Sequence, residues 1–232
     1  KGVIRPYTRP WSSGIVMVTK KDGTKRFCVD YRQVNNATIK DAYPLPRIDE
    51  ALDRLSGSKW FSCLDLNSGY WQIEVDEADK EKTAFSTRQG LFEFNLMPFG
   101  LCNAPATFER LMETVLAGLN WQICLVYLDD IIVTGKTFDD MVTNLDKVLS
   151  RLKSAGLKLK PRKCQLFGKQ VEFLGHVVSE NGIQTDPKKT QAVKDWPVPN
   201  NVHDVRSFLG FCSYYRKFIK NFSDIAKPLH CL

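Results

Sequence analysis

The chain has 232 residues, of which 43% are hydrophobic and 25% charged, so it can bury a core and is not disordered. Its longest apolar run, residues 123–128, is far shorter than the roughly 20 residues of a membrane-spanning helix, and we expect no membrane association. Seven scattered cysteines without a C-x-x-C pair fit neither a disulfide framework nor a zinc site.

Charge is unevenly distributed along the chain. Residues 1–60 carry 12 basic and 6 acidic side chains, residues 61–140 carry 5 and 13, and residues 141–232 carry 16 and 7. Basic flanks around an acidic centre suit a polyanion held at its phosphates, with the acidic centre left for divalent cations. Ordinary scatter of surface charge is an equal alternative at this point.

The first half of the chain alternates between predicted strands and helices. In chain order we expect a hairpin of residues 15–20 and 24–32, a helix over 46–57, a buried strand over 60–66, a hairpin of 84–87 and 91–97, and a helix over 105–116.

The second half begins with a tight apolar hairpin and becomes helical toward its end. We expect strands at 123–127 and 131–133, a helix over 142–156, a strand at 173–178, and only helices from 186 onward, including a long one over 202–219. A proline-containing joint at 196–199 is the predicted domain boundary, with Gly182 as the alternative.

Three carboxylates interrupt these apolar strands. Asp129 and Asp130 divide the hairpin of 123–133, and Asp65 lies in the strand of 60–66. Buried carboxylates are costly and repel one another, whereas two Mg²⁺ ions bridged by carboxylates remove both problems and form the usual clamp for displacement at phosphorus. We therefore expect these three residues to bind metal. A solvent-exposed β-turn is the alternative for the Asp-Asp pair.

The residues around these acids resemble the motifs of a known family. Tyr127-Leu128-Asp129-Asp130 resembles the Tyr-x-Asp-Asp motif of reverse transcriptases, and the sequence Leu-Asp-Leu-Asn-Ser-Gly-Tyr at 64–70 resembles their first carboxylate motif. Further segments are similar to gypsy-type LTR retrotransposon polymerases, and together they extend the resemblance over residues 1–232: Val29-Asp30-Tyr31-Arg32, Met97-Pro98-Phe99-Gly100-Leu101, Asn103-Ala104-Pro105-Ala106-Thr107-Phe108, Phe173-Leu174-Gly175-His176, Arg206-Ser207-Phe208-Leu209-Gly210 and Tyr214-Tyr215-Arg216.

The resemblance implies an α+β fold of the right-hand polymerase type. It places fingers at 1–43 and 76–103, a palm with a split βαβ sheet at 44–75 and 104–181, and a helical thumb at 182–232. It also implies that the chain is the reverse transcriptase domain of a Pol polyprotein that carries ribonuclease H and integrase domains. Such a polyprotein is expected in cytoplasmic retrotransposon particles, and in the nucleus later in the cycle.

The resemblance also implies a role for each site residue. Asp65 and Asp129 would be the principal ligands of two Mg²⁺ ions, for which Mn²⁺ can substitute, with Asp130 in support. Tyr70 would exclude a ribose 2′-hydroxyl. The other implied roles are triphosphate binding by Lys20 (or Lys21) and Arg26, a nucleotide pocket bordered by Phe99 and Gly100, primer positioning by Tyr127, Leu174 and Gly175, and duplex backbone contacts of Lys188, Lys189, Arg206, Arg216, Lys217 and Lys220. Alternatives are a core aromatic for Tyr70, a plain hairpin at 174–175 and solvated charges for the basic residues.

The expected activity is RNA-directed DNA synthesis, with an RNA or DNA template, a primer and dNTPs as partners. Three alternatives stay open. A two-metal nuclease would not need Tyr70, an RNA-dependent RNA polymerase should avoid a bulky residue there, and an inactive relic would bind nucleic acid without catalysis. The chain departs from the family pattern at Trp71, Met141 and Asn144, where His is common, and at Glu109, where Gln is usual.

Overall fold

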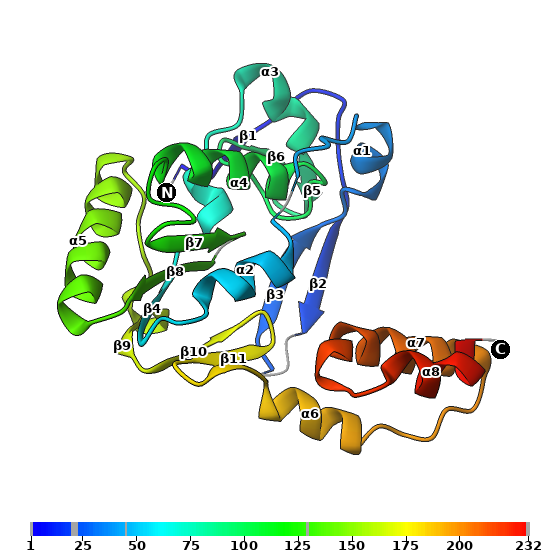
Figure 1. Cartoon of the computed structure of the whole chain (residues 1–232). Coiled ribbons are helices and arrows are strands. Elements are labelled where there is room, and N and C mark those ends of the chain that lie inside the picture. The colour runs from blue at the N-terminus through cyan, green and yellow to red at the C-terminus, as the bar shows by residue number, and fades with distance from the viewer. Residues whose placement is uncertain (1, 20–22, 45, 129, 231–232) are drawn as a thin grey trace.

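The largest sheet lies at the centre of the molecule. The computed structural model describes residues 2–19, 23–44, 46–128 and 130–230, so the predicted site residues Lys20, Lys21 and Asp129 lie outside the described residues. The central sheet has the strand order β7 (Cys124–Tyr127), β8 (Asp130–Gly135), β4 (Trp60–Asp65) and β9 (Gln165–Gly168) (Figure 1). Because β8 pairs antiparallel with both β7 and β4, those two strands run parallel on either side of it, which is the predicted split βαβ arrangement.

Both faces of this sheet are covered. On one face, α4 (Ala104–Val115) and α5 (Phe138–Ser154) pack against Leu64, Ile131 and Val133. The other face, which carries Phe61 and Ile132, packs against α2 (Ile48–Leu55) and the sheet of β10 (Gln170–Phe173), β11 (His176–Ser179) and β12 (Gly182–Thr185). A sheet buried on both sides needs apolar residues at successive positions, which explains the apolar runs in β7 and at positions 131–133 of β8.

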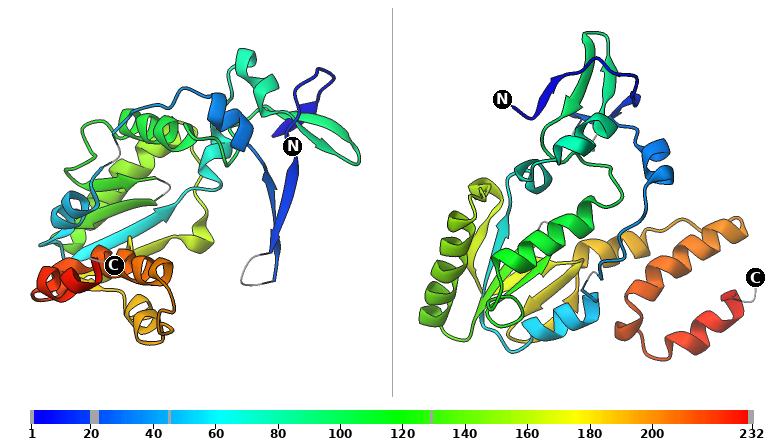
Figure 2. Two further views of the ribbon diagram at one scale, coloured as in Figure 1. Left: turned by 90° about the vertical axis from the view of Figure 1, so that its right-hand side faces the viewer. Right: turned by 90° about the horizontal axis from the view of Figure 1, so that it is seen from above.

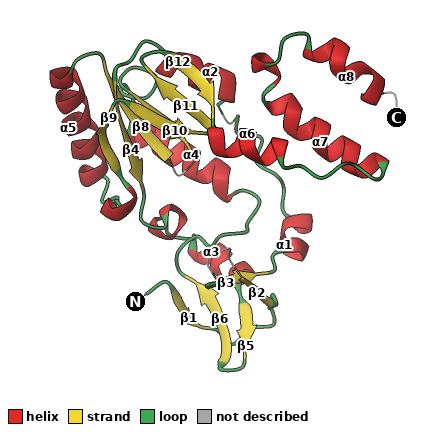
Figure 3. Cartoon of the chain, turned by 90° about the horizontal axis from the view of Figure 1, so that it is seen from below, coloured by secondary structure: helices red, strands yellow, loops and turns green. Residues whose placement is uncertain are grey.

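The N-terminal part forms two smaller sheets apart from the central one (Figure 3). One has the order β1 (Ile4–Pro6), β6 (Gly90–Phe94), β5 (Phe85–Thr87), and the other is the hairpin of β2 (Ile15–Thr19) and β3 (Lys25–Val29). The hairpin projects as a two-stranded ribbon (Figure 2), and every residue of β2 is exposed. Two short helices, α1 (Arg32–Ala37) and α3 (Glu77–Lys80), complete this region.

Three helices follow the central sheet at the C-terminal side. They are α6 (Pro187–Lys194), α7 (Val202–Tyr214) and α8 (Phe222–His230), which lie together on the side opposite α5 (Figure 1). Short 3₁₀ turns lie at Gly69–Gln72, Glu81–Thr83, Pro161–Lys163 and Arg216–Phe218. Within the described ranges, no helix combines the length and apolar character needed to cross a bilayer.

Most predicted elements are present, but several differ in extent. The predicted strands 24–32 and 91–97 are β3 (Lys25–Val29) and β6 (Gly90–Phe94), and the predicted helix 142–156 is α5 (Phe138–Ser154). The predicted strand 173–178 is divided by a turn at Leu174-Gly175. The predicted helix 202–219 ends at Tyr214, because the chain then tightens into a 3₁₀ turn. Asp130, predicted as a turn residue, is the first residue of β8.

Five short elements were not predicted: the strands β1, β9 and β12 and the helices α1 and α3. Each has six residues or fewer, which is too few for a clear hydrophobic period. The division into fingers, palm and thumb at the stated residues stays a prediction.

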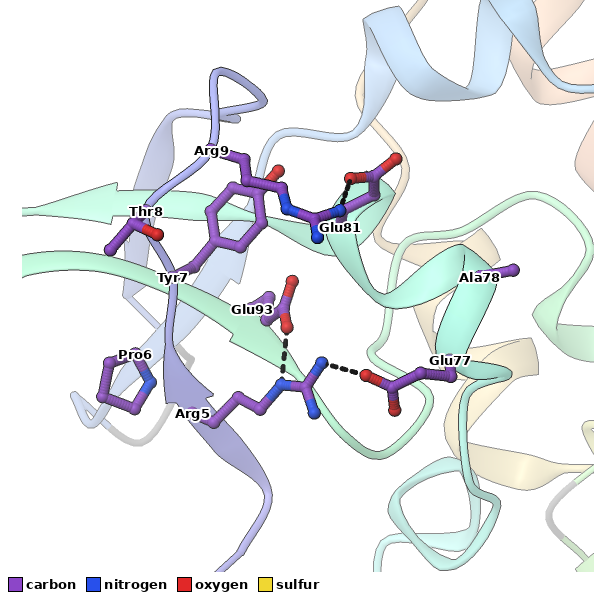
Figure 4. A pocket seen from close by; sticks show the side chains of 9 residues that line it. All are labelled: Arg5, Pro6, Tyr7, Thr8, Arg9, Glu77, Ala78, Glu81 and Glu93. Atoms are coloured by element: carbon purple, nitrogen blue, oxygen red, sulfur yellow. Dashed lines mark hydrogen bonds and ion pairs between the residues drawn. The ribbon is translucent and has the colours of Figure 1, made fainter.

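A cavity of about 430 Å³ separates β1 from α3, and an arginine bridges it. Arg5 forms ion pairs with Glu77 and with Glu93, whose Oε1 is 2.6 Å from the Arg5 Nε (Figure 4). The Glu93 side chain is only 5% exposed, so its carboxylate depends on Arg5 for a counter-charge. The hydrogen bond from Arg5 is the largest of the interactions that lower the pKa of Glu77, to about 2.

Replacing Arg5 by Met is therefore expected to lower the melting temperature by several degrees, because it strands the buried Glu93 carboxylate. Arg9→Met is the matched control, since Arg9 pairs with the more exposed Glu81 on the same cavity wall. Thermal denaturation followed by circular dichroism checks this. Equal melting temperatures for the two variants would contradict the role of Arg5.

Candidate active site

The central sheet places two of the three predicted acids directly opposite each other. In the β4–β8 register, Asp65 pairs with Asp130, so their side chains leave the same face of the sheet. Both are half-buried. Like charges at directly opposed positions destabilise a sheet, so this pair needs a cation.

A lysine provides one such cation at Asp65. The Nζ of Lys163 is 2.9 Å from the Asp65 Oδ2. Lys163 ends the 3₁₀ turn Pro161–Lys163, and the turn is fixed to the end of β4 because the Lys160 N–H donates to the Asp65 carbonyl at 2.8 Å. Lys163 is not among the site residues that the sequence predicts. It lies in the basic run Lys160-Pro161-Arg162-Lys163, which has the composition of an ordinary surface turn, so no local signal distinguishes it.

The donor set at this end of the sheet fits a hard divalent cation. Carboxylate oxygens are the ligands that Mg²⁺ prefers, and two strands hold those of Asp65 and Asp130 on one face. No cluster of three or more His, Cys, Asp or Glu residues suited to a metal occurs among the residues that the structure describes. The third predicted ligand, Asp129, lies outside them, so the structure brings together two members of the predicted triad.

A turn at Leu128 connects β7 to β8. Tyr127, the last residue of β7, pairs with Asp130, the first residue of β8. Leu128 has a φ of 53°, in the left-handed region that two-residue hairpin turns require. The Tyr127 ring meets the Phe173 ring edge-on, with 6.2 Å between centroids, so the turn packs beside the β10–β11 hairpin.

A buried glutamate contacts this turn from α4. The Glu109 side chain is fully buried, and its Oε2 accepts a hydrogen bond from the Leu128 N–H at 3.1 Å. Burial raises the pKa of Glu109 from an ordinary 4.5 to about 7, although the Leu128 N–H partly opposes this shift. The sequence had singled out Glu109 only as a departure from the family pattern.

The raised pKa of Glu109 makes stability depend on pH. The folded chain holds this proton more tightly than the unfolded chain, so the stability contributed by the neutral carboxyl is lost as the pH rises from about 4.5 through 7. Glu109→Gln removes this titration. From pH 5 to pH 8, the free energy of unfolding of wild type is therefore expected to fall by about 2–3 kcal/mol relative to that of Glu109→Gln. Urea denaturation at the two pH values measures this, and a difference independent of pH would contradict it.

Three side chains predicted for the nucleotide site, Tyr70, Phe99 and Arg26, lie together, and Phe108 joins them. The Tyr70 ring is 5.0 Å from the Phe99 ring and 5.5 Å from the Phe108 ring, measured between centroids. The Arg26 guanidinium, from β3, is 5.4 Å from the Phe99 centroid, within range of a cation–π contact. The structure thus connects the β2–β3 hairpin to the segment of Tyr70. Lys20 and Lys21, predicted at the hairpin tip, lie outside the described residues.

The loop at Phe99-Gly100 is held by a side-chain amide. Asn35 donates from its Nδ2 to the Gly100 carbonyl at 2.8 Å, and its Oδ1 accepts from the Cys102 N–H at 2.8 Å. Gly100 has a φ of 102°, a backbone conformation that favours glycine. Asn35 is not among the residues that the sequence predicts, because its role depends on contacts far along the chain.

The predicted primer-positioning residues Leu174 and Gly175 form a two-residue turn. Phe173 pairs with His176 across it, and the turn residues have φ values of 48° and 69°. The Tyr214 hydroxyl donates to the Leu174 carbonyl at 2.6 Å, and the Tyr215 hydroxyl donates to the Gly175 carbonyl at 2.8 Å. Helix α7 and the residue after it therefore anchor this turn to the C-terminal helices.

The six predicted backbone-contacting cations are all exposed, but they differ in their partners. The Nζ of Lys188 is 3.0 Å from a Glu172 carboxylate oxygen, and that of Lys217 is 3.6 Å from Asp49. The remaining four form no ion pair with any other described residue: Lys189, Arg206, Arg216 and Lys220.

Comparison with known proteins identifies the family. Residues 18–178 match the reverse transcriptase (RNA-dependent DNA polymerase) family. The chain belongs to this family. The Pol polyproteins of the Drosophila melanogaster transposons 297 and gypsy are each 43% identical to it, over 99% and 98% of the chain. The predicted membership of the reverse transcriptase family, with gypsy-type transposon Pol polyproteins among its relatives, is thus confirmed. The chain spans 22% and 23% of those two polyproteins.

Solved structures confirm the right-hand polymerase fold. A foamy viral protease-reverse transcriptase in complex with double-stranded DNA is 28% identical and superimposes with a TM-score of 0.93 over 100% of this chain and 40% of that one. The foamy viral enzyme in complex with an RNA/DNA hybrid gives a TM-score of 0.87, also at 28% identity, over 100% of this chain and 31% of that one.

Proposed function

We propose that this chain catalyses RNA-directed DNA synthesis at the Asp65–Asp130 end of the central sheet, and that it copies DNA templates as well. The observation that carries the proposal is the β4–β8 register, which sets the carboxylates of Asp65 and Asp130 side by side at one end of the central sheet. Membership of the reverse transcriptase family supports it. The same acids, together with Asp129, are the proposed catalytic residues.

The proposed cofactor is a pair of Mg²⁺ ions, with Mn²⁺ as a substitute. Asp65 and Asp129 would be the principal ligands and Asp130 a supporting one. Bound there, the ions would activate the primer 3′-hydroxyl and neutralise charge at the α-phosphorus and the pyrophosphate. The chain itself contributes position, because strands β4 and β8 hold the ligands on a rigid sheet and Lys163 adds positive charge beside Asp65.

The proposed nucleotide pocket would both exclude a ribose 2′-hydroxyl and bind the triphosphate. Tyr70 would lie under the incoming sugar, where its ring leaves no room for a 2′-hydroxyl. Its contacts with Phe99 and Phe108 support this role, since they fix the ring in place. Arg26 and Lys20 would hold the triphosphate, for which a guanidinium fork and an ammonium group are well suited.

The proposed nucleic-acid partners are a primed RNA or DNA template and dNTPs. The foamy viral relatives are described in complex with double-stranded DNA and with an RNA/DNA hybrid, which supports a duplex ligand here. Leu174, Gly175 and Tyr127 would position the primer, and the exposed cations of α6 and α7 and of residues 216–220 would follow the duplex backbone. Ribonuclease H and integrase domains are the proposed neighbours in the parent polyprotein, and cytoplasmic retrotransposon particles the proposed location.

Primer extension tests the proposal against its rivals. The purified chain is given a labelled DNA primer on an RNA or a DNA template, Mg²⁺, and either dNTPs or rNTPs. Extension of the primer on both templates with dNTPs, and little with rNTPs, is the expected result. Shortening of the primer would indicate a nuclease, preferential rNTP addition an RNA polymerase, and binding without extension a relic.

A further inference from the structure

The turn that carries Asp129 has a backbone geometry that its leucine does not favour. Leu128 has a φ of 53°, in the left-handed region where the Cβ of an L-residue crowds the following carbonyl. Such a conformation persists where the surrounding structure holds it. The residue before a predicted metal ligand therefore needs an anchor.

Glu109 is the anchor that the structure provides. Its Oε2 accepts the hydrogen bond of the Leu128 N–H at 3.1 Å, and the whole side chain is buried. The other oxygen, Oε1, is buried and has no partner among the described residues. Burying a carboxyl with so few hydrogen bonds is costly. The hydrogen bond to the turn therefore distinguishes Glu109 from an ordinary core residue.

The carboxyl reaches the turn from the face opposite the acids. Helix α4 packs on the face of the central sheet that carries Ile131 and Val133. Because side chains alternate along a strand, Asp130 and Ile132 lie on the other face. Glu109 therefore contacts the turn's backbone from the α4 face of the sheet, and it does not join the predicted metal ligands on the other face. The raised pKa of this carboxyl agrees with an environment that excludes water.

We propose that Glu109 is a positioning residue of the catalytic turn: its hydrogen bond to Leu128 fixes the backbone of the turn that precedes Asp130, without contacting nucleotide or metal. The inference rests on the proposed function, because it assigns the turn a role in catalysis. An amide at position 109 keeps an acceptor oxygen, and an apolar side chain does not. We therefore expect the amide to keep the turn in place and the apolar side chain to release it.

The test compares Glu109→Gln and Glu109→Leu with wild type. The matched control is Glu113→Leu, one turn later on the same helix, where the carboxylate accepts a hydrogen bond from the Tyr43 hydroxyl instead. Hydrogen exchange of the Leu128 amide, measured by NMR, reports the bond itself. Primer extension under steady-state conditions gives kcat and the KM for dNTP, which separates turn placement from nucleotide binding.

In Glu109→Leu the Leu128 amide is expected to exchange about tenfold faster or more, and kcat to fall about 10- to 100-fold with KM within about twofold. Glu109→Gln and Glu113→Leu should stay near wild type in kcat and in Leu128 exchange. Should Glu109→Leu not fold, Glu109→Met takes its place, since its side chain has a similar length and lacks the oxygen acceptor.

Three results would overturn the inference: a folded Glu109→Leu with unchanged Leu128 exchange and kcat, a Glu113→Leu that loses kcat equally, or a wild-type Leu128 amide without protection. A wild-type chain that extends no primer contradicts the proposed function instead, and the exchange measurements then still decide whether Glu109 holds the turn.

Discussion

Replacing Asp65 by Asn is expected to lower the rate of dNMP addition by at least about 10³-fold while leaving the melting temperature unchanged or higher. The amide has no negative charge with which to hold a divalent cation, so the chemical step loses a principal ligand. Stability behaves differently, because the replacement removes one of two carboxylates that face each other across β4 and β8. The ion pair lost with Lys163 is cheap, since the lysine side chain is 58% exposed.

Single-turnover primer extension and thermal denaturation of the same preparation check both halves of this expectation. Asp146→Asn is the matched control, an exposed carboxylate within α5 and outside the central sheet, and it should leave both quantities unchanged. Extension by Asp65→Asn at the wild-type rate would remove Asp65 from the metal site. A large loss of stability would show that the acid serves the fold instead.

Replacing Tyr70 by Val is expected to raise the efficiency of rNTP addition relative to dNTP addition about 10- to 100-fold. The ring is fixed by Phe99 and Phe108, at 5.0 and 5.5 Å between centroids, so it cannot turn aside for a 2′-hydroxyl. Valine removes most of the ring's volume from the proposed pocket. Tyr70→Phe keeps that volume and is expected to keep the discrimination of wild type.

Ratios of kcat/KM for matched rNTP and dNTP on one template measure this discrimination. A Tyr70→Val chain as selective as wild type would mean that Tyr70 is a core aromatic, the alternative that the sequence left open. A Tyr70→Phe chain that loses selectivity would point to the hydroxyl group rather than to the bulk of the ring.

The sequence predicts the central sheet well because both faces of that sheet are buried. Every position of 123–127 and 131–133 is apolar, so an acid beside or within such a strand is conspicuous in the sequence, as Asp130 and Asp65 are. The same contrast directs attention to the site before any family is considered. The resemblance then supplies roles for Tyr70, Phe99 and Leu174, which local patterns alone would leave as core or turn residues.

The remaining site residues depend on contacts between distant parts of the chain. Lys163 meets Asp65 across 98 positions, and Asn35 meets Gly100 across 65, so no local period marks either residue. Glu109 looks like a polar residue within an amphipathic helix until the structure shows its carboxyl buried under Leu128. The division of the predicted strand 173–178 was also hidden, because the left-handed turn at its centre needs the tyrosines after Ser213 as hydrogen-bond partners.

The most direct test of the metal-dependent active site is anomalous scattering from Mn²⁺ in crystals of the chain with a primed template and an incoming dNTP. The account predicts manganese within coordination distance of a carboxylate oxygen of Asp65 and beside the turn between β7 and β8, with the Asp65–Lys163 contact rearranged around it. Manganese bound elsewhere, or Asp65 still held only by Lys163 in that complex, would contradict the account.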